Sequence, residues 1–158
     1  MDDANNLVRT QECLSIPALV FLRAMDHNRS HVAAEIGVSS SELRALSRVA
    51  EAGSITPKLL AEFLEMTTGA VTAISNHLVA LNMLTRVPHP HDRRSLLLEL
   101  TSAGQETAAR LQNEFQVLFA HAARNVTPED QTRLGSLLTS MAVIIASDSK
   151  ASHAAPTT

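Results

Sequence analysis

Apolar residues recur at helical spacing along most of this chain, and short polar turns separate the segments that carry them. The first segment covers about residues 17–35, with Ser15 as a start signal and Gly37 as a stop signal. The second begins at Ser39, which stands three residues before Glu42 in the spacing of a capping box. The pattern therefore predicts two consecutive helices in the first third of the chain.

Two further helical segments follow, and only Glu65 and Met66 stand between them. Thr56 is the expected N-cap of the first segment, and Thr67 is the expected N-cap of the second. The positions expected to face the core from the first segment are Leu59, Leu60 and Phe63. Those expected to face the core from the second are Val71, Ile74, Leu78 and Leu81. Two helices joined by so short a turn are typical of a helix-turn-helix.

A β-hairpin is predicted after the helix-turn-helix. Residues 83–87 and 95–100 have the character of strands, and a polar loop with two prolines and two histidines separates them. In the second strand, apolar and other positions alternate, so that one face is expected to consist of Leu96, Leu98 and Leu100. Thr101 then caps a long helix to about residue 125, and Thr127 opens a last helix to about Ser147.

The order of these elements predicts the fold class. We expect a mainly α protein with a small β-hairpin, built as a winged helix-turn-helix core with helical arms at both ends. The final segment, residues 148–158, is small and polar and is expected to be a disordered tail.

Composition and charge narrow the function classes. The 158 residues contain 45% apolar and 3% aromatic residues without Trp or Tyr, so the core must be aliphatic. No apolar run approaches the ~20 residues that span a bilayer, the acidic N-terminus is no secretory signal, and the single Cys13 fits a reducing cytoplasm. A net charge of −3 argues against a nonspecific nucleic-acid coat, but it is compatible with a DNA reader whose basic groups are concentrated locally.

The helix that begins after Thr67 has an exposed face of small polar groups. Its expected members are Thr68, Gly69, Thr72, Ala73, Asn76, His77 and Ala80. Threonine can meet a base, a phosphate or a thymine methyl group, and asparagine can pair bidentately with adenine. The N-terminus of the helix suits a phosphate. An ordinary amphipathic helix has a similar face, but the position between a helix-turn and a hairpin favours DNA reading. Because this helix has no Lys or Arg, the hairpin loop must carry more of the charge.

Residues about 39–111 resemble the MarR family of bacterial transcriptional regulators. The stretches that carry the resemblance are LAEFLEMTTGAVTAISNHLVALNMLTRV and DRRSLLLELTSAG. The resemblance implies a homodimer on pseudo-palindromic double-stranded DNA and, less firmly, a pocket for a small organic, often phenolic, acid. It also implies an N-terminal arm and dimerisation helix at 1–36, the DNA-binding core at 37–101, and dimerisation helices at 102–147.

The start of the second strand is the expected wing. In extended chain, residues i and i+2 point the same way, so Asp92 and Arg94 face each other and Arg93 points oppositely. The resemblance implies the same pairing, in which the acid orients Arg94 for the minor groove, where negative potential attracts arginine. The alternative is a solvated hairpin tip with weak surface ion pairs.

Histidines offer two weaker metal hypotheses. His89 and His91 lie beside Asp92 on the wing, and His27 and His31 have the i, i+4 spacing that places two ligands on one helix face. A wing tip is a poor preformed site and the second pair has no third ligand, so we predict no metal and no cofactor.

Two further features bear on sensing. Cys13 resembles the cysteine of the family's peroxide sensors, but those use tyrosines to hold the thiolate and this chain has none, so it is expected to be a small interface residue. Arg44 and Arg48 can face an effector carboxylate or pair with Glu35 or Glu51.

The sequence therefore predicts a cytoplasmic, dimeric, sequence-specific DNA-binding regulator, a repressor that an effector releases. The alternative is a winged-helix dimer that binds a protein partner and no longer reads DNA. No enzyme is predicted, because no nucleophile–base constellation, phosphate loop or firm metal-ligand set occurs in the sequence.

Overall fold

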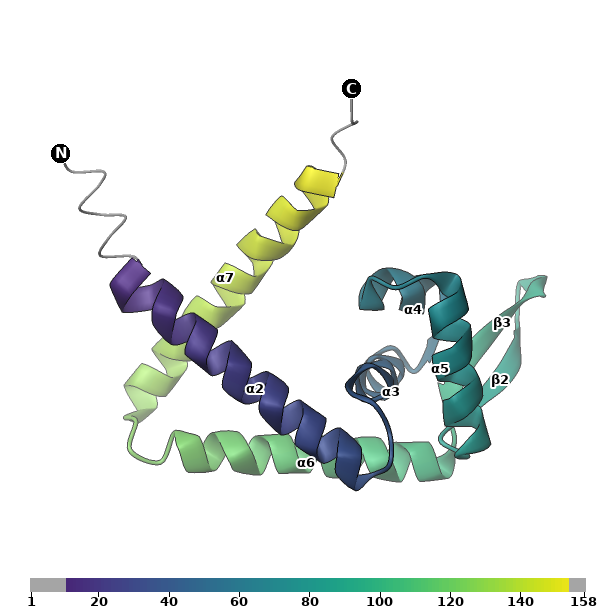
Figure 1. The fold of residues 1–158 in the computed structure, drawn as a ribbon, viewed down its shortest axis with the longest axis horizontal. Coiled ribbons are helices and arrows are strands. Elements are labelled where there is room, and N and C mark those ends of the chain that lie inside the picture. The colour runs from purple at the N-terminus through teal and green to yellow at the C-terminus, as the bar shows by residue number, and fades with distance from the viewer. Residues whose placement is uncertain (1–10, 154–158) are drawn as a thin grey trace. The chain divides into compact units, whose positions relative to one another are not determined.

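The computed structural model (Figure 1) describes residues 11–153, excluding the side chains of residues 11, 12, 93, 94 and 148–153. The chain divides into two compact units, one ending at Gln112 and the other beginning at Asn113. The fold is mainly helical with one small antiparallel sheet, as the sequence predicts.

The first helix begins earlier than predicted. A π-helical turn, η1 (Gln11–Ser15), continues directly into α2 (Ile16–Glu35). Ser15 has helical dihedrals, φ −65° and ψ −43°, and its side chain makes no capping bond, so its prediction as a start signal is wrong. The reason is that the helical turn before it already occupies the backbone groups that a cap would satisfy. The stop signal is confirmed, because Gly37 adopts φ +74° and its N–H donates to the Ala34 carbonyl over 3.1 Å.

Helix α3 (Ser40–Ala52) has the predicted capping box. Ser39 Oγ accepts from the Glu42 N–H over 3.2 Å, and Glu42 Oε2 accepts from the Ser39 N–H over 2.7 Å. Gly53 ends the helix with φ +72°, and the short strand β1 (Ser54–Ile55) follows.

The helix-turn-helix consists of α4 (Pro57–Leu64) and α5 (Thr68–Ala80). Both predicted N-caps are confirmed, because Thr56 Oγ1 accepts from the Leu59 N–H and Thr67 Oγ1 accepts from the Ala70 N–H, each over 3.2 Å. The turn contains Glu65 in the left-handed conformation, at φ 55° and ψ 43°. A non-glycine residue there costs about 1–2 kcal/mol, which the surrounding packing must offset.

The inner stripe predicted for α4 is wrong for two of its three members. Leu60 is fully buried, but Leu59 and Phe63 are 52% and 43% exposed. Helix α4 instead buries Ala61 and Leu64 beside Leu60. The sequence carries two adjacent i, i+4 apolar pairs, 59/63 and 60/64, and periodicity alone does not choose between them.

One predicted core position of α5 is also wrong. Leu81 follows the end of the helix and is 39% exposed. Ser75 is buried in addition to Val71, Ile74 and Leu78, and its hydroxyl donates to the Val71 carbonyl over 2.7 Å. A buried serine is tolerated because this bond satisfies its hydroxyl.

The hairpin consists of β2 (Leu84–His89) and β3 (Asp92–Leu100), and the three strands have the order β1-β3-β2. Both strands reach closer to the loop than predicted, with an irregularity between Pro88 and His89. Leu98 is fully buried, but Leu96 is 46% exposed because it lies toward the loop, beyond the core. The expectation that all three alternating leucines face the core is therefore wrong for Leu96.

The core of the first unit is assembled from α3, β1, α4, α5 and both hairpin strands. Ala33 near the end of α2 and Val38 just after that helix complete it. Its buried apolar members are Ala33, Val38, Leu43, Ala45, Leu46, Val49, Ile55, Leu60, Ala61, Leu64, Val71, Ile74, Leu78, Leu84 and Leu98. The core is aliphatic throughout, as the composition requires. It holds α5 against the sheet and leaves the opposite face of α5 in solvent.

Helix α6 (Ser102–Ala122) crosses from the first unit to the second, which also contains α7 (Pro128–His153). The predicted cap of α6 is confirmed, because the Gly104 N–H donates to Thr101 Oγ1 over 3.0 Å. Helix α7 continues six residues beyond the predicted end at Ser147, so the start of the expected disordered tail is helical. Residues 154–158 lie outside the described part of the chain. Among the helices described, none is long and apolar enough to cross a membrane.

Candidate nucleic-acid interface

The exposed face of α5 is the one that the sequence predicts. Thr67 at the cap and all the named positions of the face are exposed, whereas Val71 and Leu78 on the opposite side are fully buried. The exposed residues are Thr67, Thr68, Gly69, Thr72, Ala73, Asn76, His77 and Ala80. The structure thus brings the sequence-predicted reading residues together on one helix face.

Internal hydrogen bonds decide what the threonines can still offer. Thr67 Oγ1 accepts the capping bond from Ala70, so its hydroxyl proton is free to donate outward. Thr72 Oγ1 donates to the Thr68 carbonyl over 2.8 Å, which leaves its lone pairs and its methyl group for a partner. The face is therefore chemically asymmetric, with a hydroxyl donor at its start and an acceptor with a methyl group one turn later.

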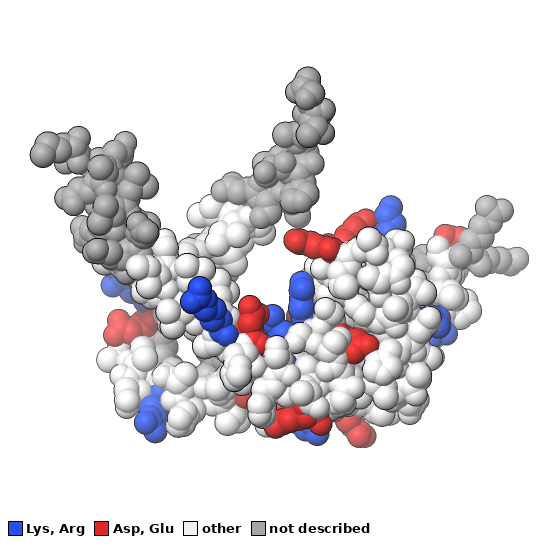
Figure 2. Space-filling view, viewed as in Figure 1, with Lys and Arg blue, Asp and Glu red and all other residues white. Residues whose placement is uncertain are grey.

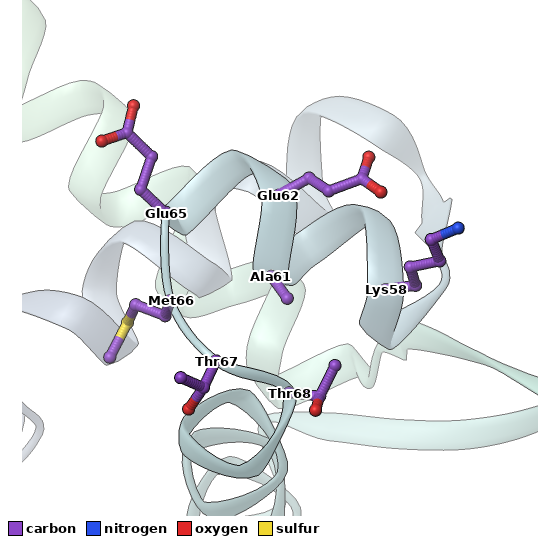
Figure 3. Close-up of a pocket in the computed structure, with 7 residues that line it drawn as sticks. All are labelled: Lys58, Ala61, Glu62, Glu65, Met66, Thr67 and Thr68. Atoms are coloured by element: carbon purple, nitrogen blue, oxygen red, sulfur yellow. The ribbon is translucent and has the colours of Figure 1, made fainter. Parts of the chain in front are cut away.

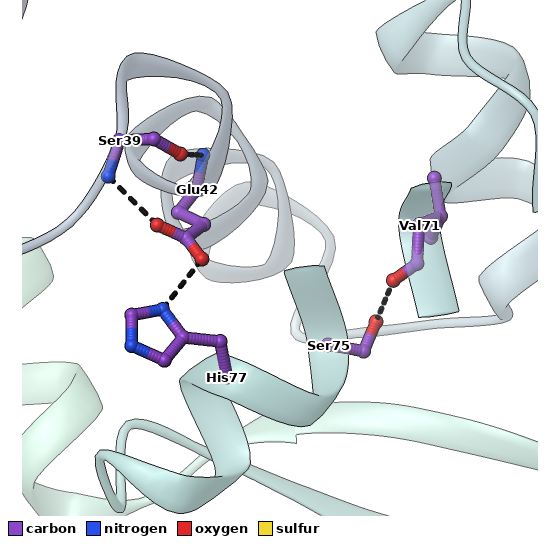
Figure 4. Close-up of polar contacts among 5 residues, drawn as sticks. All are labelled: Ser39, Glu42, Val71, Ser75 and His77. Carbon is purple, nitrogen blue, oxygen red and sulfur yellow. Dashed lines mark hydrogen bonds and ion pairs between the residues drawn. The ribbon is translucent and has the colours of Figure 1, made fainter. Parts of the chain in front are cut away.

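His77 ties α5 to α3. Its Nδ1 lies 2.6 Å from Glu42 Oε1, the second oxygen of the carboxylate that closes the capping box of α3 (Figure 4). Burial raises the pKa of Glu42, but hydrogen bonds from the Ser39 backbone and from His77 outweigh it and hold the pKa below its ordinary value of 4.5. An ionised carboxylate only accepts, so Nδ1 carries the shared proton and Nε2 remains for a partner. The sequence signalled the capping box but not this link across 35 positions.

Arg86 is a functional candidate that the sequence reasoning missed. It lies on β2, is exposed, and donates from Nη2 to Asn76 Oδ1 on α5 over 2.6 Å. The absence of Lys and Arg from α5 is thus offset by a guanidinium that the hairpin places at its face. The sequence did contain a signal for this placement. Arg86 stands two residues after Leu84, which is buried, and residues i and i+2 of a strand point to the same face of the sheet.

An open groove of about 490 Å³ lies at the turn between α4 and α5 (Figure 3). It ends at Thr67 and Thr68, and Lys58, Glu62 and Glu65 are among the residues that line it. The charged ends of these three side chains point away from the two threonines (Figure 3), and the lining is mostly apolar, so the groove itself offers little to bind an anion, although the start of a helix by itself favours anions. A phosphate contact at the beginning of α5 therefore depends on its exposed N–H groups rather than on the groove.

The wing is only partly described. Asp92 Oδ2 accepts a hydrogen bond from the Ser95 hydroxyl over 2.6 Å. The side chains of Arg93 and Arg94 lie outside the described residues, so the orientation of Arg94 by Asp92 stays a prediction. The His91 N–H donates to His89 Nδ1 over 3.2 Å, and the two rings meet edge to face with centroids 6.3 Å apart.

The metal hypotheses receive no support from a ligand cluster. In the part of the chain that is described, no three His, Cys, Asp or Glu side chains gather into a group that could hold a metal ion. His31 Nδ1 lies 3.4 Å from Glu35 Oε1 on the next turn, which is the ordinary surface pairing of a helix. Cys13 is exposed on η1.

Arg44 and Arg48 converge on Phe63. Their guanidinium carbons lie 5.9 and 5.0 Å from the centre of the Phe63 ring, within the range of a cation–π interaction. Arg48 also donates to Glu51 over 3.2 Å, so one of the surface pairings expected from the sequence is present. Phe63 was expected to face the core, but its ring is exposed and has two guanidinium groups over it. We call these three residues, Arg44, Arg48 and Phe63, the arginine–phenylalanine cluster.

Charges of both signs are interspersed among uncharged residues on the face drawn in Figure 2, and no broad single-sign surface is seen there. This distribution agrees with the small net charge of −3. A nucleic-acid partner must therefore be bound through a few placed groups rather than a general positive field.

A helix-turn-helix whose second helix is exposed, followed by a β-hairpin, defines a winged helix-turn-helix protein. Residues 36–95 match the MarR family model. The curated "Multiple antibiotic resistance protein MarR" of Salmonella typhimurium is 25% identical over 130 residues, which cover 80% of this chain and 90% of that protein. The resemblance seen in the sequence is confirmed, because the MarR family model matches residues 36–95 and the chain is similar to curated MarR proteins over most of its length.

Solved structures agree on the fold. The crystal structure of a mutant MarR from Escherichia coli complexed with operator DNA covers 84% of this chain and 96% of its own, at 24% identity and a TM-score of 0.62. The crystal structure of a Mycobacterium tuberculosis protein covers 85% of this chain and 93% of its own, at 22% identity and a TM-score of 0.73. At these identities the likeness establishes the architecture, and the contacts must be argued from this chain's own residues.

Proposed function

We propose that this regulator is a homodimeric repressor that binds a pseudo-palindromic operator and is released by a small organic acid. The observation that carries the proposal is the exposed face of α5, which offers small polar groups with unused hydrogen-bonding capacity and has Arg86 of the hairpin beside it. That the E. coli MarR structure contains operator DNA supports the same use of the fold here.

In this proposal α5 enters the major groove. Thr72, Asn76 and His77 face base edges, and the small side chains of Gly69 and Ala73 let the helix backbone approach closely. The exposed N–H groups at Thr67 and Thr68 contact a phosphate. In each protomer Arg94 reaches the adjacent minor groove, and the two reading helices of the dimer lie about 34–36 Å apart.

Uncovered apolar side chains support the dimer. In the first unit, α2 exposes Ile16, Leu19, Val20, Phe21 and Leu22. In the second unit, α7 exposes Leu134, Leu137, Leu138, Val143, Ile144 and Ile145. Soluble monomers rarely leave a helix with so many large apolar side chains in water, and a second copy of the chain is the partner that the proposal assigns to each of these two helices.

The arginine–phenylalanine cluster supports the effector. Two guanidinium groups can bind a carboxylate, and the exposed ring of Phe63 can stack on an aromatic one. A phenolic acid has both parts. Replacing Arg44 and Arg48 by glutamine is expected to leave DNA binding intact and to abolish its release by such acids.

A gel shift with DNA from upstream of this protein's own coding sequence, with and without a panel of phenolic acids, tests the proposal. A specific complex that weakens steeply with added salt and dissociates with an acid is expected. Sedimentation of the free protein tests the dimer in parallel. A folded dimer that binds no DNA at low salt would instead favour the alternative, a winged-helix module that binds a protein partner.

A further inference from the structure

Asn76 and Arg86 form a polar pair between α5 and the hairpin. Arg86 Nη2 donates to Asn76 Oδ1 over 2.6 Å, and both residues are exposed. An arginine side chain has only donors, so the amide must turn its oxygen toward Arg86 and its NH₂ group away from it. The pair therefore decides which half of the amide is available to a partner.

The sheet holds Arg86 in place for this role. Arg86 lies opposite Leu98 in the strand register, and opposite residues of an antiparallel pair point to the same face. Leu98 and Leu84 on that face are buried, so the aliphatic stem of Arg86 leaves from the edge of the core and its guanidinium emerges in solvent. Strand β2 packs against α5, so the guanidinium and the amide meet between two anchored elements.

We propose that Arg86 is a positioning and specificity-determining residue that restricts Asn76 to donating hydrogen bonds, so that the pair reads guanine. A free asparagine amide pairs with adenine by accepting from N6 and donating to N7. With Oδ1 turned toward Arg86 and one of its lone pairs engaged there, the NH₂ group is the part of the amide that points away from Arg86, and its donors match the O6 and N7 acceptors of guanine. The sequence offers adenine as a base with which Asn76 can pair, and the proposal assigns guanine instead.

This inference rests on the proposed function, because it assumes that α5 enters the major groove. Phosphate oxygens are acceptors too, and they would also suit a pair of outward donors. The two cases differ in their consequences: a base contact changes which sequence is preferred, whereas a phosphate contact changes the affinity for all sequences alike.

Selection from a pool of random DNA duplexes by the full chain supplies the test. Sequencing the bound pool identifies the site, and titration of single-base variants then measures the preference at each position. Wild type is expected to prefer guanine at one position in each half-site. Asn76→Ala and Arg86→Ala are each expected to reduce the preference at that position by about 5- to 150-fold, the range of one good base contact. The double variant is expected to lose no more than the more strongly affected single variant, because the two residues act as one unit.

Two further variants make the result specific. Asn76→Asp keeps an oxygen for Arg86 but has no NH₂ group, so it is expected to lose the guanine preference while unfolding at the wild-type temperature. Arg133→Ala removes one exposed positive charge from α7 and is expected to keep the preference. A uniform loss of affinity in Arg86→Ala, with a shallower salt dependence and an unchanged base preference, would overturn the inference in favour of a phosphate contact. A preference for adenine at the position that depends on Asn76 would overturn it as well. If wild type enriches no sequence, the proposed function fails, and this inference fails with it.

Discussion

Replacing Gly104 by alanine is expected to destabilise the junction between the hairpin and α6. A Cβ atom on Gly104 would overlap the carbonyl oxygen of Met83, and it would lie 2.9 Å from the Met83 carbonyl carbon and 3.3 Å from Leu100 Cδ2. The carbonyl has little freedom to retreat, because its oxygen also accepts the Thr101 N–H over 3.2 Å. Glycine is needed here for close approach of two backbone segments, not for an unusual φ.

The expected magnitude follows from three contributions. Overpacking in a tightly packed region costs about 1–3 kcal/mol, and loss of the Thr101–Met83 hydrogen bond costs about 0.5–1.5 kcal/mol more. Alanine recovers at most about 1 kcal/mol through its higher helix propensity. The free energy of unfolding should therefore fall by about 0.5–4.5 kcal/mol.

Gly135→Ala is the matched control, because Gly135 lies within α7 and a Cβ there would meet nothing within 4 Å. This variant should gain up to about 1 kcal/mol from propensity alone. Denaturant unfolding at one fixed protein concentration compares the two variants with wild type. If Gly104→Ala proves as stable as wild type or more stable, the close packing of α6 on the Met83 carbonyl is refuted.

Four further substitutions test other parts of the structure. The folded-state pKa of Glu42 lies below 4.5, so its carboxylate stabilises the fold above that pH, and this contribution is lost as the pH falls through the lowered pKa. In acid denaturation, the free energy of unfolding of Glu42→Gln should therefore fall less steeply with decreasing pH than that of wild type. Leu98→Ala should cost about 2–5 kcal/mol by denaturant unfolding, whereas Leu96→Ala should cost far less; equal effects would contradict the strand burial. Arg94→Ala should weaken operator binding in gel shifts without changing the thermal midpoint, and unchanged affinity would refute the minor-groove contact assigned to Arg94.

Local signals explain why helix boundaries were predictable. Ser39 with Glu42, and Thr67 with Ala70, form their capping bonds within three residues, so the chain carries the whole interaction in one short stretch. The order helix-turn-helix and then hairpin follows from such boundaries. Among the predicted helix starts, Ser15 failed because a capping residue type is informative only where the preceding chain is not already helical.

The choice of helix face was less predictable, because it depends on packing partners. Residues 59/63 and 60/64 offer α4 equivalent apolar pairs, and only the arrangement of α3 and α5 decides which pair is buried. The exposed pair contains Phe63, to which Arg44 and Arg48 contribute cations from another helix. A cluster formed by two helices is invisible to periodicity along either one.

Arg86 shows how strand register changes the electrostatic argument. Helix α5 itself has no Lys or Arg, so the DNA contacts expected from the sequence depend heavily on the wing arginines. Residue 86 is ten positions from Asn76, yet strand pairing and the packing of β2 against α5 bring its guanidinium to the helix face. An arginine in phase with buried leucines costs core packing unless its head group reaches solvent or a polar partner, and here the partner is Asn76 of α5. The positive charge that α5 lacks is thus supplied by Arg86 of β2. Its guanidinium also fixes the orientation of the Asn76 amide, which a lysine or arginine on α5 itself need not do.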